Sequence, residues 1–60
     1  MSWLFETHTI YRGKDNVVRD RREVVTAESD REARDILIKR VERSGGKVVG
    51  TPYLNRRYKK

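Results

Sequence analysis

The chain has no cysteine, and only one histidine and one proline among its 60 residues. Without cysteine it can form no disulfide and has no thiolate to hold a metal. A cysteine-free chain suits a reducing compartment, so we expect a cytoplasmic protein. There is also no long apolar run, and the first ten residues lack a cationic segment. We therefore expect no signal peptide and no membrane contact.

Few side chains suit catalysis or metal binding. His8 is the single candidate base, and a general base needs a partner and a pocket, for which a chain this short has little room. The acids Asp30, Glu32 and Asp35 are better explained as helix-start and i,i+4 partners than as metal ligands. In the stretch SGGKVVG the lysine enters a strand, the reverse of a phosphate-binding loop. We expect no enzyme, no catalytic residue, no metal site and no cofactor.

Positive charge is concentrated near the end of the sequence. The net charge is +6. Residues 1–46 hold ten Lys/Arg and nine Asp/Glu, a net charge of +1, whereas residues 47–60 hold five Lys/Arg and no acid, a net charge of +5. Such asymmetry indicates a local electrostatic contact more than general solubility.

Alternating residues predict a β-hairpin. Residues 2–12 carry β-forming side chains on both faces, which is typical of a central strand, and a turn cluster of Gly, Asp and Asn follows them. Residues 17–27 resume as a second strand. Its middle, residues 19–23, is entirely charged, which suits the edge of a sheet.

A helix follows the hairpin, and a third strand follows the helix. Ser29 and Glu32 have capping-box spacing, and Gly45 and Gly46 favour a helix end. Between them, the apolar residues fall on one stripe, formed by Ala33, Ile36, Leu37 and Val41. Residues 47–51 then read as a short strand, with Pro52 at an edge or bulge.

These elements predict an α+β fold with one ββαβ domain. A right-handed crossover gives a three-stranded antiparallel sheet of order 2-1-3, with the helix packed on one face. We expect Trp3, Phe5 and Tyr11 to face the helix, because they carry the larger apolar area. Residues 1–54 would form the compact domain and residues 55–60 a basic C-terminal tail.

The C-terminal segment is the strongest candidate site. Arginine forks suit phosphate oxygens, and tyrosine rings suit unpaired bases. The competing interpretation is a frayed basic terminus that only aids solubility. A weaker set of cations lies in the second strand. The candidate nucleic-acid-binding residues are Arg56, Arg57, Lys59, Lys60, Tyr58 and Tyr53, extended by Arg19, Arg21 and Arg22.

The stretch VVTAESDREARDIL, after the hairpin, resembles a pattern in the small archaeal large-subunit ribosomal protein of the LX type. The matching positions include Val24, Val25, Ala27, Glu28, Glu32 and Ala33. The resemblance implies a hairpin, a helix with an acidic start, a basic final strand and a ribosomal RNA–protein setting. The compact, Arg/Glu-rich style is also similar to that of small bacteriophage proteins.

The sequence thus favours a non-enzymatic module that binds nucleic acid, with RNA or an RNA–protein surface ahead of a defined DNA site. No helix presents unpaired charge for reading a major groove. The alternative is a phage-type protein that binds and inhibits or redirects a host protein. It would use the open sheet face or an edge strand, with the basic arm in an acidic protein surface. Self-association into a homodimer through the uncovered sheet face is a third possibility.

Overall fold

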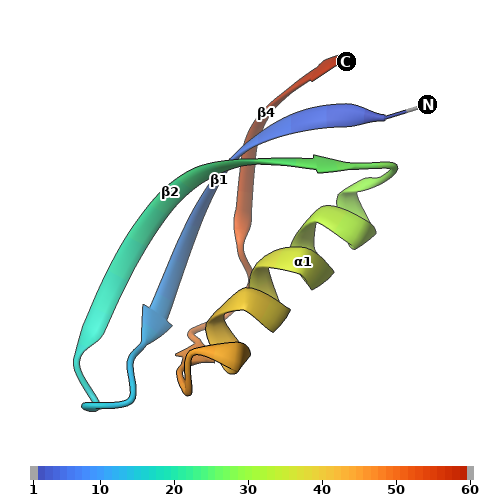
Figure 1. The fold of residues 1–60 in the computed structure, drawn as a ribbon. Helices are drawn as coiled ribbons and strands as arrows, with labels where there is room; N and C mark the ends of the chain where they lie inside the picture. Colours follow the sequence, from blue (N-terminus) through green and yellow to red (C-terminus); the bar gives the residue numbers. More distant parts are fainter. Residues whose placement is uncertain (1, 60) are drawn as a thin grey trace.

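A computed structural model describes residues 2–59 (Figure 1). The elements are β1 (Trp3–Arg12), β2 (Val18–Ala27), α1 (Asp30–Arg43), β3 (Lys47–Val48) and β4 (Tyr53–Lys59). β1 is the central strand, with β2 on one side and both β3 and β4 on the other, and every pairing is antiparallel. The α+β class, the ββαβ order and the 2-1-3 arrangement are confirmed.

The third strand, expected over residues 47–51, extends only over Lys47–Val48, and a separate strand, β4, follows it. β3 pairs with the last residues of β1, and β4 pairs with its first half. Between them the chain turns at Gly50, whose φ of 74° is in the left-handed region, and at Pro52, which cannot donate to a ladder. The break therefore lies where the two residues least suited to a strand occur.

The basic tail expected at residues 55–60 is a strand over residues 55–59, so that expectation is corrected; Lys60 lies outside the described residues. Pairing with β1 satisfies backbone groups that would otherwise line a free edge of the central strand. The sequence did not predict this strand. Nearly all of its side chains are exposed and several are charged, so they show no alternation of apolar residues. Figure 1 shows β4 running beside the start of β1, so that the two chain ends lie close together.

The core lies between one face of the sheet and α1. Its buried residues are Phe5, Val25, Ala27, Ala33 and Leu37, with Trp3, Ile36 and Leu54 partly buried against them. The expected orientation of β1 is confirmed for Phe5, which is 1% exposed and central to this cluster. Because side chains alternate along a strand, Trp3 and Tyr11 share this face and are half-buried.

Capping defines both ends of α1. Ser29 Oγ accepts a hydrogen bond from the backbone N–H of Glu32 at 3.2 Å, as the capping-box spacing predicts. At the other end Gly45 has φ 89° and donates to the Glu42 carbonyl, while Gly46 donates to the Val41 carbonyl. This is a Schellman ending. A Cβ at Gly46 would lie 2.8 Å from the Arg12 carbonyl oxygen, so β3 can approach β1 only with glycine there.

One helix covers one face of the sheet and leaves the other open (Figure 1). Within residues 2–59 no helix has the length and apolar character needed to cross a bilayer.

Candidate nucleic-acid interface

β4 separates its charged residues onto two faces. Cross-strand partners share a face, so Arg56 and Tyr58, opposite even-numbered residues of β1, lie on the open face. Arg57 and Lys59 lie on the side of the helix. The basic segment is therefore not one surface, as its sequence suggested.

A β-bulge brings the two tyrosines of β4 to the same face. Tyr53 and Tyr58 are five positions apart, and strict alternation would place them on opposite faces. The register shifts at Asn55, which has no partner between Leu54 and Arg56. Tyr53 consequently pairs with His8 and joins Tyr58 on the open face.

We call Tyr53, Arg56, Tyr58 and Arg22 the tyrosine face. Tyr53 is 56% exposed and Tyr58 40% exposed, which leaves ring surface free for contact. The Arg56 guanidinium carbon lies 5.3 Å from the centre of the Tyr58 ring. At that distance an arginine is held over the ring by a cation–π interaction. Arg22 belongs to this face because it pairs with His8 in β1.

A hydrogen bond orients the Tyr58 ring, and a ring contact with His8 lies beside Tyr53. The Tyr58 hydroxyl donates to Glu6 Oε2 at 2.7 Å, and this bond raises the pKa of Tyr58 above its ordinary value. The His8 ring centre lies 6.3 Å from that of Tyr53 in a tilted arrangement, and His8 Nε2 is 3.1 Å from Asp20 Oδ2. Sequence reasoning did not include His8 or Glu6 in the site. The alternation of β1 places them on one face, but only the register of β4 brings them to the tyrosines.

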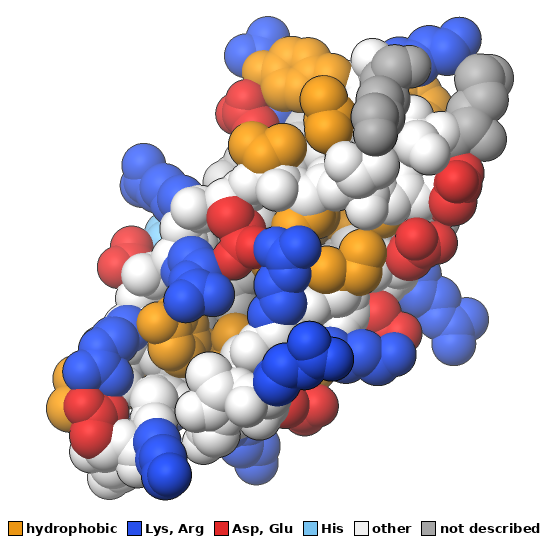
Figure 2. Space-filling model, viewed as in Figure 1, with side chains coloured by type: hydrophobic (Ala, Val, Ile, Leu, Met, Phe, Trp, Pro, Cys, Tyr) orange, Lys and Arg blue, Asp and Glu red, His pale blue; other side chains and the backbone are white. Residues whose placement is uncertain are grey.

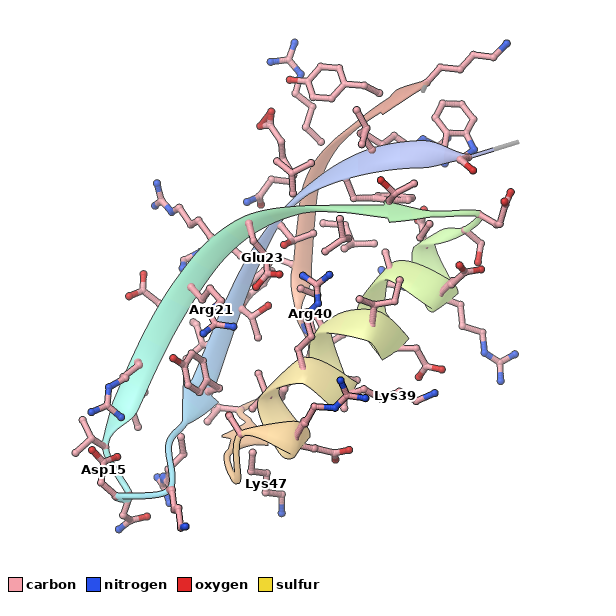
Figure 3. The ribbon with its side chains drawn as sticks, viewed as in Figure 1. Asp15, Arg21, Glu23, Lys39, Arg40 and Lys47 are labelled. Atoms are coloured by element: carbon pink, nitrogen blue, oxygen red, sulfur yellow. The ribbon has the colours of Figure 1, made fainter. Side chains whose placement is uncertain are left out.

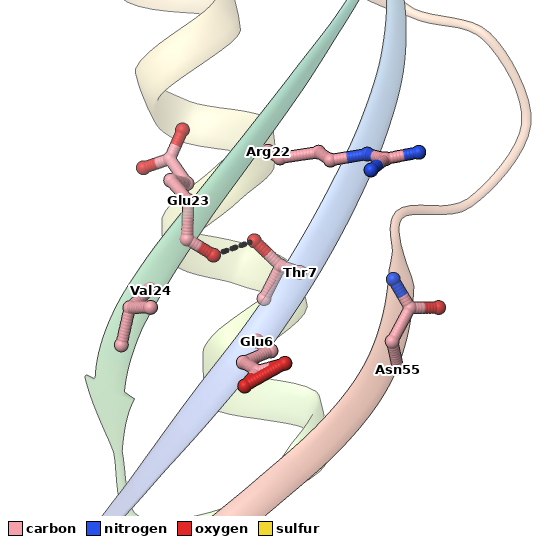
Figure 4. Close-up of a pocket in the computed structure, with 6 residues that line it drawn as sticks. All are labelled: Glu6, Thr7, Arg22, Glu23, Val24 and Asn55. Carbon is pink, nitrogen blue, oxygen red and sulfur yellow. Dashed lines mark hydrogen bonds between the residues drawn. The ribbon is translucent and has the colours of Figure 1, made fainter.

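A polar hollow of about 420 Å³ lies beside the tyrosine face. It is lined by Glu6, Thr7, Arg22, Glu23, Val24 and Asn55. In Figure 4 the helix is behind the sheet, the Arg22 side chain reaches across β1, and the Asn55 amide stands on β4 opposite it. Thr7 lies at the base of the hollow, where its hydroxyl donates a hydrogen bond to the Glu23 carbonyl at 2.8 Å. The hollow offers a guanidinium, an amide and a carboxylate within one small space.

Arg57, another candidate residue of β4, makes its contacts within the protein. Arg57 stacks on the Trp3 ring, with its guanidinium carbon 4.7 Å from the ring centre, and lies 3.6 Å from Asp30 Oδ1. Arg57 thus joins β4 to the start of β1 and to the helix N-terminus. Lys59 is exposed on the same side, and Lys60 lies outside the described residues.

Two candidates of β2 also face the helix side. Arg19 makes a two-pronged hydrogen bond to Asp15, at 2.8 and 2.7 Å. This contact lowers the pKa of Asp15 to about 2, with the Val17 backbone N–H adding to the effect. Arg21 lies 5.8 Å from the Tyr11 ring centre and 3.7 Å from Glu23. Both arginines have internal partners that would compete with phosphate.

A second basic area lies near the C-terminal end of α1. In Figure 3 the side chains of Arg21, Glu23 and Arg40 point toward one another between β2 and the helix, and Arg40 forms an ion pair with Glu23. Lys39 and Lys47 lie nearby at the end of the helix (Figure 3). Figure 2 shows blue side chains gathered over this half of the molecule, with red ones between them. Glu23 lies among these cations and pairs with Arg21 and Arg40, so the charge of this area is mixed.

Residues 2–59 contain no cluster of three or more His, Cys, Asp or Glu that could hold a metal ion. The sequence matches no model of a protein family, and it matches neither a curated protein nor a solved structure.

Proposed function

We propose that this protein is a non-enzymatic module that binds single-stranded RNA with its open sheet face. One observation carries the proposal: the bulge at Asn55 places Tyr53 and Tyr58 on the same uncovered face, beside Arg56 and Arg22. Exposed aromatic rings next to arginines suit the binding of a single strand, because bases stack on the rings and phosphates pair with the guanidinium groups.

The site fits a splayed single strand better than a duplex. Two rings on a sheet can each receive an unpaired base, whereas stacked bases within a helix are inaccessible to them. The hollow beside the rings presents the Arg22 guanidinium and the Asn55 amide, which can hydrogen-bond to a phosphate or a base edge. The overall charge of +6 adds a long-range attraction for any polyanion.

The test is a fluorescence-anisotropy titration with a labelled single-stranded RNA of mixed sequence. Tyr53→Leu and Tyr58→Leu are each expected to weaken binding by roughly 5- to 150-fold, because a base–aromatic stack contributes about 1–3 kcal/mol. The same sequence in duplex form is expected to bind less tightly than the single strand.

β4 supplies its own matched control. Arg56→Gln and Lys59→Gln each remove one positive charge from the same strand, but on opposite faces. Arg56→Gln is expected to weaken RNA binding more than Lys59→Gln does, at equal salt concentration. Equal losses for the two variants, or unchanged binding by both tyrosine variants, would show that the open face is not the RNA site.

An alternative function has a specific observation in its favour. Within residues 2–59, β2 has no neighbour on its outer side, and it carries Val18 and Val24, which are 53% and 59% exposed. Exposed aliphatic residues on a free strand suit contact with protein more than with RNA. Capture from a lysate with and without nuclease separates the two functions, because an RNA partner is lost on nuclease treatment and a directly bound protein is retained.

A further inference from the structure

We infer that two copies of this chain associate through their β2 strands, antiparallel and centred on Arg21, to form one continuous sheet. The partner is therefore a second copy of the same chain. The inference rests on the edge of the sheet and not on the proposed RNA site. It also differs from association through the open face, because only strand edges meet.

The two edges of the sheet differ in what they offer a partner. The β3–β4 edge is interrupted between Val48 and Tyr53 and bulges at Asn55, two features that protect an edge from pairing. β2 is ten residues long and pairs with β1 in unbroken register, with no proline or bulge. Its outer backbone groups therefore form the longest regular template for another strand.

The order of charges along β2 is self-complementary in one register. In a symmetric antiparallel pair, a residue whose backbone groups point toward the partner strand must lie opposite another such residue. The two-fold axis must therefore pass between one residue and its own copy. With the axis at Arg21, opposite charges and like apolar groups face each other. The pairs across the axis are Arg19 with Glu23, Asp20 with Arg22, and Val18 with Val24, each occurring twice.

Neighbouring registers lack this match. An axis at Asp20 places Arg19 opposite Arg21 and the two Asp20 carboxylates opposite each other. An axis at Arg22 leaves Asp20 facing Val24. Like charges directly opposite one another destabilise a pair of strands, so only the Arg21 register is favoured along most of its length. The charged centre of β2 thus disfavours general aggregation while permitting one self-pairing.

The register also gives Arg22 an acidic partner, which it lacks among the described residues of the single chain. No acid of the described residues lies within ion-pair distance of Arg22, and Asp20, whose Oδ2 is 3.1 Å from His8 Nε2, would gain a second partner. Val18 and Val24 are the two exposed aliphatic residues of β2, and they would cover each other on the open face. The one like-charged contact, Arg21 with its copy, is moderated by Glu23 at 3.7 Å.

Sedimentation of the full chain at concentrations up to about 1 mM tests the association, since a dissociation constant in that range is then visible. Asp20→Arg and Arg22→Asp are each expected to weaken dimerisation by at least about tenfold, because two attractive pairs become repulsive. The double variant Asp20→Arg/Arg22→Asp restores both pairs and is expected to dimerise like the natural chain. An equimolar mixture of the two single variants is expected to form heterodimers.

Glu42→Arg is the control for Asp20→Arg, because it makes the same change of charge on the exposed side of α1. Circular dichroism confirms that each variant is folded. The inference would be overturned by a natural chain that stays monomeric at about 1 mM. It would equally be overturned if the single variants dimerise as the natural chain does, or if the double variant dimerises as weakly as the single variants.

Cross-linking tests the register independently, since the chain has no cysteine of its own. Opposed Cα atoms of an antiparallel pair lie about 4.5–5.5 Å apart, within reach of a disulfide. Arg21→Cys, on the symmetry axis, is expected to oxidise to a covalent dimer. Arg22→Cys is displaced from its copy and is expected to remain uncross-linked. Efficient cross-linking of Arg22→Cys in place of Arg21→Cys would refute this register.

Discussion

Two threonines on the same face of β1 have opposite hydrogen-bonding status. Thr7 and Thr9 are 3% and 1% exposed. Thr7 Oγ1 donates to the Glu23 carbonyl at 2.8 Å, whereas Thr9 Oγ1 has no partner among the described residues. A buried hydroxyl loses its hydration, and only a protein partner offsets that loss. The two side chains therefore contribute differently to stability despite their equal chemistry.

Thr9→Val is expected to raise the free energy of unfolding by about 1 kcal/mol, because it removes an unsatisfied buried hydroxyl at nearly constant volume. Thr7→Val is the matched control and is expected to lower it by about 1 kcal/mol, because it breaks a satisfied bond. Urea denaturation of both variants measures the difference. A Thr9→Val variant less stable than Thr7→Val would contradict the assignment.

At the scale of elements, the β1–β2 turn depends on one carboxylate. Asp15 accepts hydrogen bonds from Arg19 and, at 3.2 Å, from the Val17 backbone N–H. Asn16 adopts φ 68°, a left-handed conformation that asparagine tolerates. The charged form of Asp15 is therefore the one that the folded turn favours, and the ordinary pKa of 3.8 falls to about 2.

The turn is expected to weaken in acid. Because the folded-state pKa of Asp15 is lower than the unfolded value, its contribution is present above about pH 4 and is lost as the pH falls toward 2. A carboxyl-carbon NMR titration of Asp15 measures this pKa. In an Arg19→Leu variant the pKa is expected to return toward its ordinary value. A natural chain in which Asp15 titrates near 3.8 would rule out the Arg19 contact in solution.

At the scale of the whole molecule, the thin core makes β4 indispensable to the fold. A chain of 60 residues is near the lower limit of independent folding. β4 pairs with the first half of β1 and places Leu54 against the core and Arg57 on Trp3. The basic segment is therefore a structural part of the domain as well as a candidate site.

Removal of residues 55–60 is expected to abolish cooperative folding, because β1 loses most of its pairing with β4, including the pairing of Phe5 with Arg57. Thermal denaturation followed by circular dichroism measures this loss. Arg56→Gln, which keeps the strand, is expected to retain a cooperative transition. A truncated chain that melts cooperatively would restore the interpretation of this segment as a tail.

The sequence by itself determined the hairpin, the capped helix with its apolar stripe, and the edge position of β2. These features depend on local chemistry: alternation, the spacing of Ser29 and Glu32, the Gly45–Gly46 ending, and a charged run that a central strand would not tolerate. Each can be read from residues that are neighbours along the chain.

Only the tertiary structure decided that the basic segment is a strand and which of its residues share a face. Alternation defines two faces but does not say which one the helix covers, and a bulge exchanges them within a single strand. Nothing in the sequence indicates the bulge at Asn55, yet the bulge places Tyr53 on the same face of the sheet as Tyr58. The candidate site thus depends on the long-range register of β4 against β1, which local sequence does not encode.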